Sequence, residues 1–421
     1  MKFRFFQQFK LISISLSPNV QKDDVSLALK LLFQPWKWKR GKAIKELENQ
    51  FKEYLGVKYA FSFNSGRSAF FAILKALDLE QNTNVSLQAF TCNAVPNPIL
   101  WAGLNPVYID CDNDFNVDIE KLKLLIRENK HSEKVVVVQH TFGLPVNMDE
   151  VMNIVQQNNL TLIEDCAHAL GAEFGGKKVG TFGKASFFSF SRDKVISSVY
   201  GGMAITNDDD VGKKLQQLQK EFGQPSRFWI KQQLLHPILL HYMILPLYKF
   251  LDLGKIFLVL SQWLHVLSKA VSFKEKRGLR PNYFPKALPN ALAILVLNQF
   301  NKLDKFNEHR KKIAEFYYNE LKDTRFILPS KENNIFLRFA VRHPKAHEII
   351  YDAWHKENML LGDWYTTAIA PDDTKMDEMK YSVGMCKNAE KLAKETLNLP
   401  THINTTIEDA KRIVNFLRQW R

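Results

Sequence analysis

Two residues that could share one piece of chemistry follow separate apolar runs within residues 160–207. The run 160–163, consistent with a buried strand, leads into Glu164 and Asp165, and Lys194 lies just after the apolar run 185–190. Taken singly, an aspartate at a strand end is typical of a turn or helix cap, and a lone lysine is typical of a solvated surface. Together, a lysine can hold an aldehyde as a Schiff base while a carboxylate keeps a pyridine nitrogen protonated. Pyridoxal phosphate (PLP) chemistry requires this combination.

The residues around this pair carry a resemblance that runs through most of the chain. In order, the sequence contains EDCAHALGA from Glu164, GKKVGTFGKASFFSFSRDK from Gly176 and GGMAITND from Gly201. These segments closely resemble the DegT/DnrJ/EryC1/StrS family, the sugar aminotransferases of PLP fold type I. Further matches run from about Gly41 to the C-terminus and are interrupted by one foreign segment.

The elements that must position these residues alternate between short strands and longer helices. The uninterrupted β-branched run 135–138 is typical of a buried parallel strand, and helical patterns of ten or more residues separate such runs. This alternation predicts a doubly wound α/β fold. The resemblance implies a large domain with a mostly parallel seven-stranded sheet flanked by helices, plus a smaller C-terminal α+β domain. We divide the chain into an N-terminal arm (1–40), a PLP-binding domain (41–211), an inserted apolar and basic helical segment (212–281), and interface helices with the small domain (282–421).

Composition excludes several other classes. The chain has 421 residues, a formal net charge of +14 and no nucleic-acid-binding motif, so we expect no nucleic acid partner. Its four cysteines show no metal-ligand spacing, which predicts no metal site and suits a reduced, cytoplasmic compartment. The basic and apolar N-terminus lacks a cleavage site, which argues against a signal peptide. The cluster Trp36-Lys37-Trp38 either packs on the body or contacts an interface.

A small polar loop before an apolar helix could bind a phosphate. Asn64-Ser65-Gly66-Arg67-Ser68 precedes the helical pattern 69–77, and a helix start presents free N–H groups to an anion. A plain helix cap by Ser65 is the alternative from the residues alone. By the resemblance, this loop holds the cofactor phosphate through Gly66, Arg67 and Ser68.

The resemblance also assigns roles to residues in the central stretch. Lys194 would form the Schiff base and shuttle the proton, Asp165 would pair with the pyridinium nitrogen, and His168 would lie beside the phenolic oxygen of the cofactor. Ser189 would bind the phosphate.

At three positions the chain departs from the family. The stacking aromatic aligns with Cys92, so either Phe90 stacks on the cofactor or it packs in the core. The asparagine that reaches the partner subunit's phosphate aligns with Pro285, and Asn282 or Asn290 could substitute for it. Before the lysine stands Ser191-Arg192-Asp193. Arg192 either meets a substrate diphosphate or carboxylate, or pairs with Asp193.

The foreign segment is apolar and basic. Residues 232–248 and 256–268 contain no formally charged residue, but neither run reaches the roughly 20 apolar residues of a spanning helix. Two interpretations stay open. The segment is either a helical hairpin packed on the body or on a second subunit, or a helical pair that lies on an anionic membrane through residues 227–272.

We therefore interpret the chain as a PLP-dependent aminotransferase. It would move an amino group from glutamate onto a nucleotide-linked keto-sugar for glycan or cell-surface polysaccharide biosynthesis. The retained lysine argues against the branch of the family that carries histidine there and removes a sugar oxygen. We expect a cytoplasmic homodimer, peripheral at the inner membrane face if the foreign segment binds lipid. The alternative is a PLP-binding or cofactor-free relative that acts as a membrane-associated scaffold or sensor.

Overall fold

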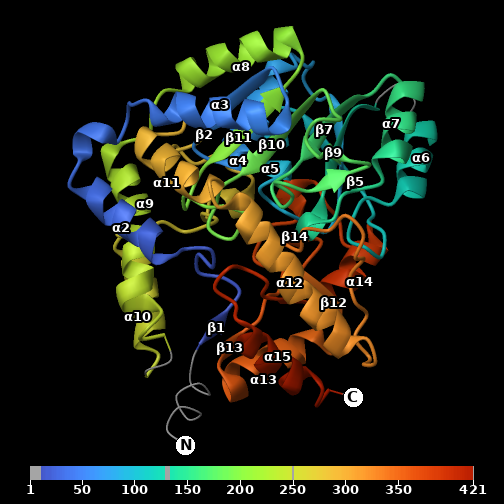
Figure 1. Ribbon diagram of the computed structural model, residues 1–421. Coiled ribbons are helices and arrows are strands. Elements are labelled where there is room, and N and C mark those ends of the chain that lie inside the picture. Colours follow the sequence, from blue (N-terminus) through green and yellow to red (C-terminus); the bar gives the residue numbers. More distant parts are fainter. Residues whose placement is uncertain (1–10, 129–132, 249–250, 421) are drawn as a thin grey trace, which may run out of the picture.

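The computed structural model describes residues 11–128, 133–248 and 251–420. Its centre is a seven-stranded sheet (Figure 1). In spatial order the strands are β2 (Tyr59–Phe63), β11 (Gly202–Thr206), β10 (Ala185–Ser189), β7 (Thr161–Asp165), β6 (Glu133–Gln139), β3 (Asn84–Gln88) and β5 (Asn105–Ile109). All neighbours pair in parallel except β11, which is antiparallel to both β2 and β10. The expected mostly parallel seven-stranded α/β fold is confirmed.

The β-branched run in β6 shows why the sheet is buried on both faces. Successive side chains of a strand point to opposite faces. Val135 and Val137 accordingly pack in the core that includes Phe70 and Leu74, whereas Val136 and Val138 pack in a second core. Helices therefore have to cover both sides of the sheet.

Helices follow most of these strands and supply that cover (Figure 1). They are α3 (Ala43–Leu55), α4 (Gly66–Ala76), α5 (Pro96–Trp101), α6 (Ile119–Glu128), α7 (Met148–Gln157), α8 (Asp209–Phe222), α11 (Asn290–Phe300) and α12 (Leu303–Leu321). The amphipathic helix expected near residues 41–55 is α3, which buries Leu47, Phe51 and Leu55.

The C-terminal region is a smaller α+β unit with its own core. It contains β12 (Phe339–Arg342), antiparallel to β15 (Thr396–Leu399), with α13 (Ala346–Glu357), α14 (Lys387–Glu395) and α15 (Ile407–Leu417). Two short strands tie it to the rest: β13 (Met359–Leu360) pairs with β1 (Ile12–Ser13), and β14 (Ile369–Ala370) pairs with β4 (Thr91–Cys92). The second pairing fixes the loop that contains Cys92.

The remaining elements are short or lie at one side of the molecule. The arm contains β1 and α2 (Lys22–Leu32), and residues 1–10 of the expected arm lie outside the described part. A hairpin joins β8 (Glu173–Phe174) to β9 (Lys177–Lys178), and single 3₁₀ turns are η1 (Pro35–Lys37), η2 (Thr141–Gly143), η4 (Glu275–Arg277) and η5 (Asp377–Met379).

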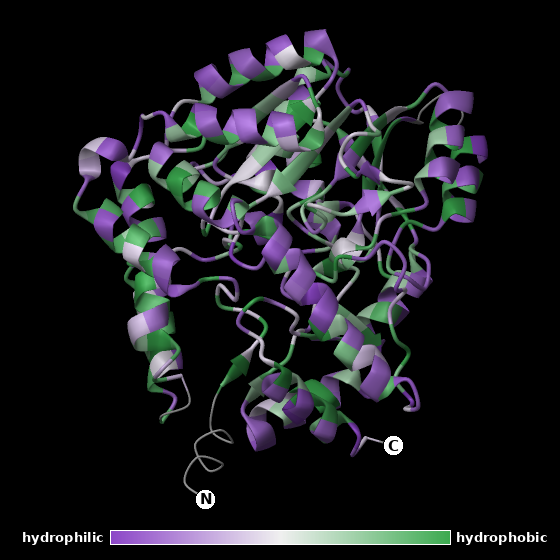
Figure 2. Cartoon of the chain, in the orientation of Figure 1, coloured by the Kyte–Doolittle hydropathy of each residue, from purple (hydrophilic) through white to green (hydrophobic). Residues whose placement is uncertain are grey.

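Helices also form in the foreign segment. They are α9 (Arg227–Leu239), the π-helical turn η3 (Leu240–Ile244) and α10 (Leu253–Trp263), and α9 and α10 extend along one side of the molecule (Figure 1). Hydrophobic residues run along both helices (Figure 2), and Ile256, Val259 and Trp263 of α10 are exposed. No helix in the described ranges is long and apolar enough to cross a membrane.

Candidate active site

Asp165 and Lys194 lie on the same cavity, at the carboxyl edge of the sheet. Asp165 is the last residue of β7, and Lys194 lies in the loop after β10, the strand that pairs with β7. Ligands of open α/β sheets bind at this edge. The cavity has a volume of about 140 Å³. Its lining includes Ser65, Gly66, Arg67, Cys92, Asp165, His168, Ser189, Arg192, Lys194, Tyr200, Ala270, Val271, Trp364 and Tyr365.

The amine of Lys194 is set up to be a nucleophile. Burial lowers the pKa of Lys194 to about 8, because removing an ammonium from water disfavours the charged form. Nζ lies 2.7 Å from Nε2 of His168. A lysine with a lowered pKa is partly neutral near pH 7, which nucleophilic attack on an aldehyde requires.

The bonds of His168 support a neutral amine. The backbone N–H of Phe142 donates to Nδ1 of His168 at 3.3 Å, so the imidazole proton resides on Nε2. Nε2–H then donates to Lys194 Nζ, which must offer a lone pair, and the Tyr365 hydroxyl lies 3.4 Å from the same nitrogen. Burial lowers the pKa of His168 well below its usual value, which keeps the ring neutral.

The two adjacent carboxylates at the end of β7 have different surroundings. Glu164 accepts backbone N–H bonds from Gly180, Phe182 and Gly183 and lies 3.3 Å from Nε2 of His140. It therefore stabilises a turn. Asp165 accepts one bond from Ala167 N at 2.9 Å, and burial raises its pKa to about 6. Asp165 is thus ionised at neutral pH and lies on the cavity.

The same structural role of Glu164 explains a group that resembles a metal site. His140, Glu164 and Cys166 bring one ligand atom each within 4.8 Å of one another. Nδ1 of His140, however, accepts from Val146 N, and Glu164 already accepts the N–H groups of the turn. Burial also raises the pKa of the Cys166 thiol well above its usual value, which disfavours the thiolate that metals prefer. We assign these three residues to the core.

The polar loop at the start of α4 faces the cavity with its backbone. Ser65 caps the helix, since its hydroxyl accepts from Ser68 N at 3.0 Å. Gly66 leaves room for an anion: a Cβ there would lie 3.0 Å from Cβ of Ser189. The Ser189 hydroxyl lies on the cavity, 3.0 Å from the hydroxyl of Ser191. The N-terminus of α4 and the hydroxyl-bearing Ser189 thus line the same cavity, and a helix N-terminus favours an anion.

Other predicted site residues take different positions. The Ser68 hydroxyl points to Asn64, at 2.7 Å, and Ser68 does not line the cavity. The Arg67 side chain forms a buried ion pair with Glu275. Of the two aromatic-position candidates, Cys92 lines the cavity, whereas Phe90 is fully buried among Phe115, Phe142 and Tyr365.

Two aromatic residues that the sequence analysis did not single out cover the cavity from the small domain. The Trp364 ring stacks on His168 with a centroid distance of 5.4 Å, and Lys194 Nζ lies 4.8 Å from the Trp364 centroid. Tyr365 adjoins it. The dipeptide lies 170 residues beyond Lys194, where sequence spacing gives no signal, so only the strand pairing of β14 with β4 brings it near the site.

Hydrogen bonds and exposure distinguish the alternatives for Arg192 and for the asparagine that would reach a partner subunit. Asp193 accepts from Ser17 N at 3.3 Å, and Arg192 instead donates to Ser268. Asn290 is used inside the chain, where it accepts from Ala43 N and donates to the carbonyl of Lys37. Asn282 is exposed. Of the two asparagines that could replace the family residue, only Asn282 is therefore accessible to a partner subunit.

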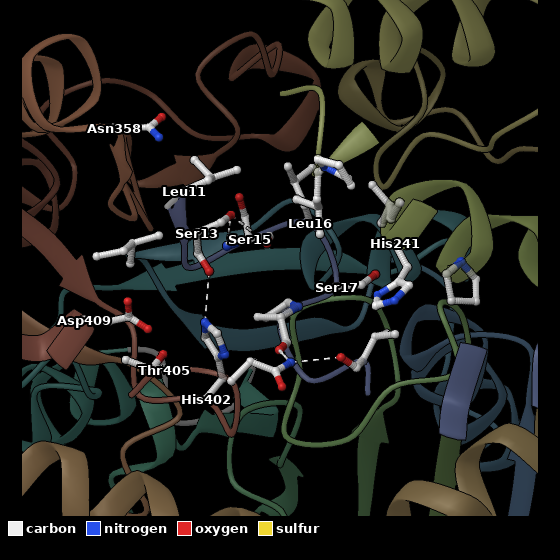
Figure 3. A pocket seen from close by; sticks show the side chains of 18 residues that line it. Leu11, Ser13, Ser15, Leu16, Ser17, His241, Asn358, His402, Thr405 and Asp409 are labelled. Carbon is white, nitrogen blue, oxygen red and sulfur yellow. Dashed lines mark hydrogen bonds between the residues drawn. The ribbon is translucent and has the colours of Figure 1, made fainter. Parts of the chain in front are cut away.

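A larger cavity of about 640 Å³ lies elsewhere, between the arm, the end of α9 with η3, and the small domain (Figure 3). Ser13, Ser15 and Ser17 of the arm cross it between His241 and Asp409. No lysine or arginine is present among the described residues that line it. Nε2 of His402 is hydrogen-bonded to the Ser13 carbonyl at 2.9 Å. Its described lining contains the carboxylate of Asp409 but lacks the lysine amine that the chemistry above needs.

Comparisons with known proteins show the family and the fold of the chain. A sequence model of the DegT/DnrJ/EryC1/StrS aminotransferase family matches residues 19–235 and 279–418. GDP-perosamine synthase of Caulobacter vibrioides is 26% identical over 96% of this chain and 96% of its own length. Helicobacter pylori PseC, an aminotransferase of pseudaminic acid biosynthesis by its title, superimposes with a TM-score of 0.75 at 22% identity, covering 97% of this chain and 99% of PseC. An E. coli GDP-4-keto-6-deoxy-D-mannose-3-dehydratase with bound hydrated PLP gives a TM-score of 0.74 at 20% identity and coverages of 97% and 100%.

Proposed function

The chain belongs to the DegT/DnrJ/EryC1/StrS aminotransferase family, and on this premise we propose that it is a PLP-dependent transaminase acting on a nucleotide-linked keto-sugar. The observation that carries the proposal is the buried Lys194 amine, 2.7 Å from His168, on one cavity with Asp165. Relatives named for GDP- and UDP-linked amino sugars support the substrate class. The scaffold or sensor alternative finds no support in these comparisons.

The residues of the cavity fit PLP. A carboxylate that is ionised at neutral pH, a helix N-terminus and a serine hydroxyl belong to residues that line it. The partly neutral Lys194 follows β10, which lies between β2 and β7 in the strand order of the sheet. When bound, the cofactor supplies an electron sink for the substrate carbon that gains or loses the amino group.

Each side chain then has a definite task. Lys194 would hold the cofactor and carry a proton to or from the substrate carbon, for which a pKa near neutrality is suited. Asp165 would favour a positive charge on the ring nitrogen by Coulomb attraction. Ser189 and the N–H groups at Gly66 would hold the phosphate. Trp364 and Tyr365 exclude water from the cavity and orient His168.

Lys194 also decides between the two chemistries found on this fold. A dehydratase with this fold is among the similar structures, so the fold alone does not select the reaction. A lysine at this position can return the proton that transamination needs, and by resemblance the deoxygenating branch carries histidine instead. Lys194 therefore favours amino transfer.

The proposal is tested by amino transfer itself. Purified protein with PLP and glutamate is incubated with GDP- or UDP-linked 4-keto-6-deoxy sugars, and 2-oxoglutarate is measured. We expect stoichiometric 2-oxoglutarate and amino sugar with at least one acceptor, and none with the Lys194→Ala variant. Release of a deoxygenated sugar without 2-oxoglutarate would contradict transamination.

We propose glutamate as amino donor and a homodimer as the active unit. Support for a second copy comes from the exposed apolar side chains of Leu29, Phe33 and Trp36 on α2 and the following turn, since such a cluster is costly in water. Asn282 is available to reach a partner. Light scattering of the purified protein tests the oligomer, and comparing glutamate with glutamine and aspartate tests the donor.

We also propose a cytoplasmic enzyme that contacts an anionic membrane surface through α10. The exposed apolar stripe Ile256, Val259, Leu260 and Trp263 supports this contact, because a helix with an outward apolar face needs an apolar partner. Basic residues such as Lys269 and Lys274 flank the stripe in sequence. Four free cysteines suit a reducing compartment. Flotation with phosphatidylglycerol vesicles, against neutral vesicles, tests the contact.

A further inference from the structure

Arg192 is a buried cation whose hydrogen bonds are incomplete. It lines the cavity and is 9% exposed. Its Nη2 donates to the carbonyl of Ser268 at 2.6 Å and to the Ser268 hydroxyl at 2.8 Å. Its Nε is buried and has no hydrogen-bond partner among the described residues. Burying a polar group without a partner is unfavourable, so the guanidinium has a donor to offer to a ligand.

Arg192 has an acidic neighbour, Asp193, which lines the same cavity and favours the charged form of the guanidinium. In the described part of the chain Arg192 nevertheless forms no ion pair with a carboxylate, and Asp193 accepts from Ser17 N. Arg67 is also near Tyr200: the guanidinium carbons of Arg192 and Arg67 are 5.6 Å and 5.8 Å from the centroid of that ring. Glu275 neutralises Arg67. Of the two guanidinium groups, Arg67 is thus paired with a carboxylate in a salt bridge, whereas Arg192 is not paired in this way within the described chain.

Arg192 is held in place by a segment that the family model does not match. Residues 236–278, which the family model leaves unmatched, are called the insert below, and its last part, residues 268–278, is called the return segment. The Ser268 hydroxyl donates to Gln233 at 2.8 Å, and the Ala270 carbonyl accepts from the Tyr200 hydroxyl at 3.2 Å. Ala270 and Val271 line the same cavity as Lys194. The insert therefore forms one wall of the active site.

From these contacts we propose that Arg192, oriented by Ser268 of the insert, binds a phosphate group in the active-site cavity. A guanidinium fork matches phosphate oxygens in geometry and charge, and a buried one gains most from an anionic ligand. The inference rests on the proposed function for the identity of that group. It is either the diphosphate of the nucleotide-linked acceptor or the phosphate of the cofactor.

Binding measurements with four probes test the proposal and separate the two sources. Pyrophosphate and GDP are titrated by calorimetry, and PLP and pyridoxal by absorbance, into the wild type, Arg192→Gln and Arg192→Lys. We expect Arg192→Gln to weaken at least one phosphate-bearing probe tenfold or more, and Arg192→Lys to weaken it less. A loss confined to pyrophosphate and GDP assigns the acceptor diphosphate. A loss for PLP without one for pyridoxal assigns the cofactor phosphate.

Controls keep the result interpretable. Arg418→Gln removes a surface arginine that pairs with Glu320 and should change none of the four affinities. If Arg192→Gln fails to fold by circular dichroism, Ser268→Ala replaces it, with a smaller loss of phosphate affinity expected because only one of two acceptors is removed. Unchanged affinity for all phosphate-bearing probes in a folded variant would overturn the proposal, as would equal losses for PLP and pyridoxal with none for pyrophosphate or GDP. Calorimetry needs no catalysis, so inactivity with intact binding counts against the proposed function instead.

Discussion

The strand-end side of the active site and the return segment line one cavity but are held by different interactions. Asp165 is fixed by the ladder between β7 and its neighbours, which sets its position to within one residue. The return segment contains only the short turn η4 among its described residues and is held by side-chain bonds from Arg67, Arg192 and Tyr200. The sheet thus supplies the reactive groups, and long-range polar contacts enclose them. Substitutions at the strand ends should abolish catalytic activity. Substitutions that affect the return segment should change stability and ligand binding.

The largest effect is expected from Lys194→Ala. Without the amine neither cofactor attachment nor proton transfer to carbon is available, and we expect 2-oxoglutarate formation to fall by roughly 10³-fold or more. Lys255→Ala is the matched control, because Lys255 pairs with Asp252 on the far helix α10. Activity of Lys194→Ala within tenfold of the wild type would mean that the chemistry is elsewhere.

Asp165→Asn should lower kcat by about 100-fold, since an amide removes the charge that keeps the ring nitrogen protonated. The substitution preserves shape, so circular dichroism and the melting temperature should stay near those of the wild type. Steady-state kinetics with saturating PLP measure the effect. A kcat within threefold of the wild type would exclude the assigned role of Asp165.

Glu275→Ala tests whether the buried ion pair with Arg67 anchors the return segment. Arg67 and Glu275 are 8% and 0% exposed, and removing one partner leaves a buried charge unpaired. We expect the free energy of unfolding to fall by about 3–5 kcal/mol in urea titration. Glu348→Ala breaks an exposed pair and should cost under about 1 kcal/mol. Equal losses in the two variants would show that the return segment is not anchored through Arg67.

The pH dependence of cofactor attachment should report the environment of Lys194. Its folded pKa, about 8, lies below the usual lysine value, and only the neutral amine attacks the aldehyde. The rate should therefore rise as pH rises through about 8 and approach a plateau above it. Stopped-flow absorbance at constant ionic strength measures this rate. A midpoint near pH 10 would instead indicate a solvated lysine.

The smallest effect on the body is expected from the triple variant Ile256→Ser, Val259→Ser and Trp263→Ser. These side chains are exposed, so each should change the free energy of unfolding by less than about 0.5 kcal/mol and leave kcat unchanged. Flotation with anionic vesicles should be lost. A large fall in kcat would show that the outer face of α10, and not only the return segment, supports the active site.

Much of the strand-end side of the active site can be predicted from the sequence, because its residues lie beside strong local patterns. The apolar runs before Asp165 and Lys194 predict strands, and strand ends predict a shared edge. The same reasoning could not choose between Phe90 and Cys92. They are two residues apart, and Phe90 has a positive φ of 63° that turns the chain there. The position of that turn depends on the pairing of β4 with β14, nearly 280 residues away.

The contacts of the return segment cannot be predicted in this way. Glu275 meets Arg67 across 208 residues, and no spacing or motif marks either residue for the other. The apolar runs of residues 232–248 and 256–268 predict helices, but no pattern in the polar residues that follow indicates that Ser268, Ala270 and Val271 approach the cavity. Tertiary contacts alone determine that path. Arg192 departs from the family pattern in the sequence, but its hydrogen bond to Ser268 depends on the tertiary fold.

One spectrum tests the central claim most directly. Purified wild type and Lys194→Ala are mixed with PLP, and absorbance is scanned from 300 to 500 nm before and after glutamate. The account predicts a visible band in the wild type that depends on Lys194 and is lost when glutamate converts the cofactor to its amino form. A wild type without the band, or a band that persists unchanged in Lys194→Ala, would contradict the assignment of this cavity as the active site of a PLP-dependent aminotransferase.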